Sequence, residues 1–279
     1  MKKNHYFLNM LIVAVVLLFS TSCKKDKVSQ DEAEATEYIT DAMVESTFDE
    51  VGEIADQAFN SFSIGLKSTE ESNFLFAPCA TITVDTVVMP HLMTIDFGVE
   101  NCLCRDGNYR RGQIVVTFTG RYREPGTIRT HTFVDYYVND NHVEGTSTIS
   151  NLGFNENDDI YYSIVVEGSI TFVGGEGTIS WTANHIRTWI EGYETMTWMD
   201  DIYLIEGESS ITHLNDNTTT REILTPLRRE LTCPHFVSGT IEITPEERPV
   251  RVLDFGDGNC DNIATVTING NTYTIRLRR

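Results

Sequence analysis

The sequence predicts an all-β protein, a many-stranded antiparallel sheet or sandwich with one N-terminal amphipathic helical segment. Three observations support this fold class. From about Phe74 onward, apolar and polar residues alternate in short runs, which is the period of a β-strand. Turn-forming residues separate these runs. The motif Asp-Phe-Gly-x-x-Asn-Cys occurs twice, at 96–102 and 254–260, so the β portion contains an internal repeat.

Residues 1–22 have the pattern of a bacterial lipoprotein signal peptide. Lys2 and Lys3 precede an apolar run from about Phe7 to Phe19, too short to span a membrane comfortably, and small residues lead directly into Cys23. We expect the thiol of Cys23 to carry the lipid. The alternative is a plain signal peptide that leaves Cys23 as an ordinary thiol. Because Lys24 follows the anchor where an inner-membrane retention signal has Asp, the expected address is the outer membrane.

The segment after the anchor is predicted to contain a polar tether at 23–30 and then a helical segment with its linker at 31–73. Apolar residues between Asp31 and Phe62 recur at helical spacing, while Asp, Glu and Gln fill the other positions. This pattern predicts either one helix or two short helices joined near Ser46. The helical segment is expected to pack against the β body.

Residues 74–279 are predicted to form the β-rich body. The strongest predicted turn is Asn269-Gly270, between two alternating Val/Ile/Thr runs. Glycine positions divide some of the longer runs. The predicted strands are 80–88, 114–122, 127–138, 142–150, 160–167, 169–173, 177–183, 195–198, 202–206, 208–214, 222–224, 236–243, 251–255, 263–268 and 272–277.

The internal repeat covers 79–123 and 233–279, and each copy begins with a cysteine and carries another after its Asp-Phe-Gly element. Because a hairpin brings its ends together, one disulfide per copy is expected, each stabilising the fold by roughly 3 kcal/mol. Spacing leaves open whether Cys102 or Cys104 pairs with Cys79. The disulfide candidates are therefore Cys79, Cys102, Cys104, Cys233 and Cys260.

The chain is strongly acidic, with 41 acidic and 21 basic residues and a formal charge of -20, which becomes -22 once the signal peptide takes away Lys2 and Lys3. Such a surface repels phosphates, so nucleic acid and anionic lipid head groups are not expected partners. The expected contact with a membrane is the lipid anchor. The further partner that we expect is a protein or a glycan.

No motif nominates a catalytic residue, a cofactor or a resident metal. The sequence has neither H-E-x-x-H nor G-x-S-x-G, and the paired carboxylates at 158–159 and 200–201 are expected by chance in so acidic a chain. A weak calcium candidate is formed by Asp254, Asp257 and Asp261, although their spacing is not that of an EF-hand loop. Turn formation after a strand is the favoured interpretation of these three residues.

Aromatic residues concentrate in the middle third of the chain. If they form a solvent-facing row, their flat faces could stack on sugar rings, and the candidates are Trp181, Trp189, Trp198 and Tyr203. Buried cross-strand pairs explain the same residues and are the favoured interpretation. The choice depends on which sheet face they occupy.

Several ordered elements carry a resemblance to a known group of proteins. They are the segments 96–102, 106–112, 119–126, 137–140, 143–145, 254–262 and 269–273. Through them the chain resembles a family of uncharacterised β-rich lipoproteins from Bacteroidetes-type bacteria, over most of its length after about Phe74. The resemblance implies an envelope address and a β architecture. It implies no activity and transfers no catalytic residue.

These observations predict a lipid-anchored envelope or surface lipoprotein with a non-enzymatic structural, adhesive or interaction role. Two alternatives stay open: a glycan-binding module associated with polysaccharide uptake, and a hydrolase whose site the sequence does not reveal. Which face of the membrane the body occupies also stays open.

Overall fold

The computed structural model describes residues 43–59, 79–195, 199–233 and 235–277. The chain divides into two compact units, residues 1–43 and 44–279. Almost all described residues belong to the second unit, so the fold below is the fold of that unit. Cys23, the tether and the predicted linker lie outside the described residues.

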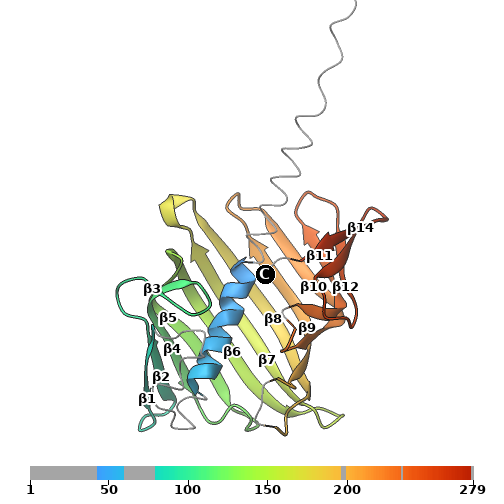
Figure 1. The fold of residues 1–279 in the computed structure, drawn as a ribbon. Helices are drawn as coiled ribbons and strands as arrows, with labels where there is room; N and C mark the ends of the chain where they lie inside the picture. The colour runs from blue at the N-terminus through green and yellow to red at the C-terminus, as the bar shows by residue number, and fades with distance from the viewer. Residues whose placement is uncertain (1–42, 60–78, 196–198, 234, 278–279) are drawn as a thin grey trace, which may run out of the picture. The chain divides into compact units, whose positions relative to one another are not determined.

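The second unit is one sheet of fourteen strands, preceded by a helix at 43–59 (Figure 1). The strands are β1 (Thr81–Asp85), β2 (His91–Asp96), β3 (Cys102–Leu103), β4 (Tyr109–Phe118), β5 (Ile128–Val138), β6 (Asn141–Phe154), β7 (Ile160–Thr171), β8 (Thr178–Glu191), β9 (Ile202–Thr212), β10 (Thr218–Glu230), β11 (Phe236–Pro245), β12 (Arg251–Asp257), β13 (Ile263–Ile268) and β14 (Asn271–Arg276), with a short 3-10 turn η2 (Val173–Gly175) before β8.

Every strand pairs with its neighbours in antiparallel orientation, and the order in the sheet follows the order in the chain. The exception is β3, which pairs with β4 beside the main path. The predicted all-β class with one N-terminal helix is therefore confirmed, and the arrangement is a single sheet. The strands β1 and β14 are its two edges.

Two predicted breaks between strands are wrong, because the glycines there lie inside continuous strands. β7 runs through Gly168 and β9 runs through Gly207. At Gly168 a Cβ atom would lie 2.1 Å from the ring of Phe48 in the helix. The glycine thus lets the helix approach the strand closely. Of the strand predicted at 195–198, Thr195 lies outside any strand and the rest lies outside the described residues. The predicted strands 80–88 and 114–122 also run past the ends of β1 and β4, the strand predicted at 222–224 is only part of β10, and β2 was not predicted.

The helix buries one apolar stripe against the sheet. Its side chains at Val44, Val51 and Ile54 are at most 1% exposed. Phe48 packs edge-on against Phe133 of β5, with ring centroids 6.2 Å apart. The described helix covers part of the region where the sequence predicted helical structure, and residues 43–59, the described part of that region, form one continuous helix.

Acidic residues of the helix are paired with arginines of the sheet. Asp56 contacts Arg129 of β5 at 2.5 Å and Glu45 contacts Arg221 of β10 at 2.9 Å. A third pair joins Glu50 to Arg110 of β4 at 2.8 Å. These charge-assisted bonds link the helix to strands on both sides of the sheet's centre.

Arg110 is fully buried and has a second partner, Asp106, at 2.6 Å. Burial raises the pKa of Asp106, but the hydrogen bonds and charge of Arg110 together with hydrogen bonds from Asn108 outweigh it and hold the pKa below its usual value. At Glu50 burial is the larger effect and the pKa is raised. Asp106 is therefore the stronger partner of this buried cation.

Two disulfides form, one in each copy of the repeat, as predicted. Cys79 pairs with Cys102, and Cys233 pairs with Cys260. The partner of Cys79, which spacing left open, is Cys102. Cys104 is a free thiol that is 3% exposed, and burial raises its pKa.

The predicted turn at Asn269-Gly270 joins β13 and β14. Both residues have positive φ, 51° and 79°. This is the backbone that an Asn-Gly pair adopts most readily in a two-residue hairpin, so local chemistry defines this turn.

Candidate functional site

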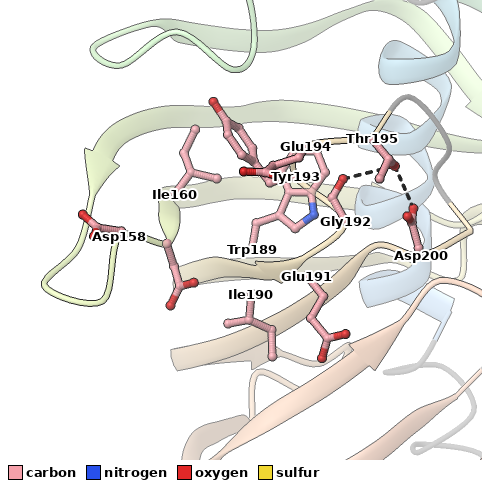
Figure 2. Close-up of a pocket in the computed structure, with 11 residues that line it drawn as sticks. Asp158, Ile160, Trp189, Ile190, Glu191, Gly192, Tyr193, Glu194, Thr195 and Asp200 are labelled. Atoms are coloured by element: carbon pink, nitrogen blue, oxygen red, sulfur yellow. Dashed lines mark hydrogen bonds between the residues drawn. The ribbon is translucent and has the colours of Figure 1, made fainter.

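One concave site among the described residues is a pocket of about 430 Å³ at one rim of the sheet (Figure 2). It lies where the β6–β7 turn meets the segment that leaves β8. The pairing of Ile160 with Trp189 places these two segments side by side. The lining residues are Asp158, Asp159, Ile160, Trp189, Ile190, Glu191, Gly192, Tyr193, Glu194, Thr195 and Asp200.

Five of the lining residues are acidic, and none of the lining residues described is basic. Glu191 is 3.4 Å from Arg228, and Asp200 accepts a hydrogen bond from Thr195 at 3.0 Å (Figure 2). The backbone N–H of Asp159 donates to the Asn155 side chain at 2.9 Å, which shapes the β6–β7 turn. A pocket of this composition favours a cationic group.

The inner wall of the pocket is aromatic. Trp189 packs edge-on against Tyr193, with ring centroids 5.5 Å apart. The ring centroid of Trp189 also lies 5.3 Å from that of Tyr203. The Arg123 guanidinium lies 4.6 Å from the Trp189 ring centroid. The same guanidinium donates to the Tyr193 carbonyl at 2.5 Å and to the Thr195 carbonyl at 3.1 Å. Arg123 therefore holds the loop that forms one side of the pocket.

Behind this loop lies a buried carboxyl, Asp201, which is 6% exposed. Burial raises the pKa of Asp201, and the Tyr203 hydroxyl donates to it at 3.4 Å. Gly192 has φ +89°, and a Cβ atom there would lie 2.4 Å from the Asp201 carboxyl oxygen. Only glycine fits this position without displacing the carboxyl, so the loop's path depends on Gly192.

Sequence reasoning found part of this pocket and missed the rest. The pairs at 158–159 and 200–201 were noted as acidic, and three of these four residues line one pocket. Gly192 and Glu194, which also line the pocket, and Arg123, which holds its loop, were not predicted to share a site with these acidic residues. Their common position depends on the register of β7 against β8, which no local signal in the sequence encodes.

The predicted glycan-stacking residues are largely buried. Trp181, Trp189 and Tyr203 are 2%, 4% and 8% exposed. Trp198 lies outside the described residues. The three described side chains form cross-strand and ring contacts, so their faces are covered by protein and do not form an open row.

The three acidic residues of the calcium candidate cap local backbone or side-chain groups. Asp254 accepts from the Gly256 N–H at 2.8 Å, and Asp261 accepts from the Ile263 N–H at 2.8 Å. Asp257 accepts from the Asn259 side chain at 3.3 Å. Among the residues that the structure describes, no group of three or more His, Cys, Asp and Glu side chains is arranged to hold a metal ion.

No protein-family model, no curated protein and no solved structure matches the chain. Within the described ranges, no helix is both long enough and apolar enough to cross a membrane.

Proposed function

We propose that this protein is a lipid-anchored lipoprotein of the outer membrane, attached through Cys23, with a non-enzymatic binding or assembly role. The observation that carries the proposal is the pair of disulfides in the body, Cys79–Cys102 and Cys233–Cys260. Stable disulfides belong to oxidising compartments, which agrees with the export signal that ends at Cys23. The resemblance to envelope lipoproteins of Bacteroidetes-type bacteria supports the same address.

The rim pocket supports the binding role and indicates the chemistry of the partner. Its five carboxylates suit a cationic group such as a lysine or arginine side chain. A basic segment of a partner protein is therefore the expected occupant. The burial of Trp181, Trp189 and Tyr203 disfavours the glycan alternative, because a sugar ring needs an open aromatic face.

The anchor is tested by metabolic labelling with a radioactive fatty acid in a bacterium that processes lipoproteins. The wild-type chain should take up the label and fractionate with the outer membrane, and Cys23→Ala should abolish the label. Cys104→Ala is the matched control, because Cys104 is a buried free thiol and its replacement should leave the label unchanged. A labelled Cys23→Ala variant, or an unlabelled wild type, would refute the anchor.

A further inference from the structure

The turn between β1 and β2 exposes three consecutive apolar side chains. Val87, Val88 and Met89 are 92%, 48% and 66% exposed. Single apolar residues on a surface are ordinary, but a contiguous group that projects from an acidic protein indicates a contact surface. We call these three residues the apolar tip.

The apolar tip is held in a defined conformation. The Val87 N–H donates to the Asp85 carboxylate at 2.8 Å, and His91 Nδ1 donates to the Val88 carbonyl at 3.0 Å. One bond therefore fixes the entry to the turn and the other fixes its exit. These two bonds hold the β1–β2 turn in a conformation in which the side chains of the apolar tip are exposed.

One further exposed apolar side chain lies on the same rim as the apolar tip. His91 pairs with Phe118, and Phe118 pairs with Arg129, so the start of β5 lies on the same rim. Ile128, the first residue of β5, is 44% exposed. The acidic pocket lies further along this rim, at β7 and β8, and is separate from the apolar tip.

We propose that the apolar tip inserts into the hydrocarbon edge of the membrane that holds the lipid anchor; this inference rests on the proposed function. A convex group of apolar side chains can enter the lipid acyl region without a matching groove in a partner protein. Val87, Val88 and Met89 carry no charged or strongly hydrogen-bonding side-chain group, so these side chains can enter the acyl boundary while the backbone of the turn stays near the head groups. From Thr86 to Pro90 there is no charged residue.

The anchor can bring the apolar tip to the membrane. Nineteen residues separate Cys23 from Met43, where the described helix begins. A chain of that length spans at most about 70 Å, more than the height of a domain this size. Because the whole chain carries a formal charge of -20, insertion should be favoured on neutral lipid and weakened by anionic lipid.

The test compares the apolar tip with a matched position at the other end of the same hairpin. Val99 is also 92% exposed, but it follows β2 on the opposite rim. The mature lipidated protein carrying Val87→Cys or Val99→Cys is labelled with an environment-sensitive fluorophore. It is then reconstituted into vesicles of phosphatidylcholine and phosphatidylethanolamine. Cys104 is buried and the other body cysteines are bonded, so the introduced thiol is the reactive one among the described residues.

The label at position 87 should shift to the blue, resist quenching by iodide and be quenched by lipids that carry a nitroxide on the acyl chain. The label at 99 should stay water-exposed. Adding phosphatidylglycerol should reduce the shift at 87, and Met89→Asp should reduce the inserted fraction about tenfold. Equal, water-like behaviour at 87 and 99 would overturn the inference.

Protection from iodide at position 87 without quenching by nitroxide lipids would also overturn the inference, since it means a protein contact. Fatty-acid content is measured in the same preparations. A lipidated protein with a water-exposed tip leaves the proposed function standing, whereas a protein without lipid removes both.

Discussion

The two copies of the Asp-Phe-Gly motif show how one local sequence is used in two different environments. In both copies the Asp side chain accepts a hydrogen bond at 2.8 Å from the glycine N–H two residues later, Gly98 in the first and Gly256 in the second. In both, a disulfide closes the hairpin. The motif therefore encodes its own turn and cross-link.

The surroundings of the two copies differ. In the first, Phe97 packs on Tyr136, Tyr136 stacks on Phe133, and Phe133 contacts Phe48 of the helix. In the second, Phe255 packs on Phe236 within a small cluster. The first copy is thus connected to the helix and the centre of the sheet.

The second copy ends in the hairpin β13–β14, whose last strand is mostly exposed. The first copy, by contrast, is followed by long strands that carry the helix. The comparison teaches that a motif can determine a turn, while the stability of each end depends on what packs against it.

Removing the buried cation of the first copy should have the largest effect. Arg110→Met leaves Glu50 and Asp106 without their shared partner, and we expect a loss of about 3–5 kcal/mol in the free energy of unfolding. The measurement is urea denaturation followed by circular dichroism. The control is Arg276→Met, since Arg276 is exposed on β14 and should cost about 0.5 kcal/mol or less. Equal costs would contradict the difference between the two ends.

Removing either disulfide should cost nearly the same, despite the different surroundings. The sequence separations are 23 and 27 residues, for which the chain-entropy model predicts about 3.5 kcal/mol in each case. The variants are the double replacements Cys79→Ala with Cys102→Ala and Cys233→Ala with Cys260→Ala, compared by urea denaturation. A much larger cost at the first copy would mean that native packing, rather than the unfolded chain, sets the contribution.

Acid should destabilise the β5 region next to the first copy. His131 of β5 is 1% exposed, and burial lowers its pKa to about 4, with Asp56 opposing this and Arg129 adding to it. The folded state keeps the ring neutral, whereas the unfolded chain binds a proton near pH 6.5. The contribution of neutral His131 to the free energy of unfolding is therefore complete above pH 6.5. It falls as the pH drops toward 4, by at most about 3 kcal/mol.

His131→Leu should flatten this part of the stability profile, measured by urea denaturation at a series of pH values. If the variant loses stability in acid as steeply as the wild type, another group is responsible for the dependence.

Much of the fold could be predicted because its signals are local. Alternation identified most strands, and the Asn-Gly pair identified the β13–β14 turn. The strand boundaries failed at Gly168 and Gly207, where a glycine reads as a break. At Gly168, its actual role is to admit the ring of Phe48 from a helix far away in the chain.

The candidate site was less predictable. The rim pocket joins the β6–β7 turn to the segment after β8, and Arg123 reaches it from a third loop. None of the contributing residues lies in a local sequence motif that indicates a binding site. Only the register of the strands brings them together, and register depends on long-range pairing.

By itself, the sequence determined the all-β class, the antiparallel hairpins, the repeated turn and the presence of cross-linking cysteines, since these depend on neighbours within a few residues or on one hairpin. Tertiary structure decided that the strands form one sheet, that Cys102 rather than Cys104 bonds to Cys79, and that the aromatic residues are buried. It also paired the acidic helix with arginines of three strands. These outcomes depend on which distant surfaces exclude water from one another, and that is settled only when the whole unit has folded.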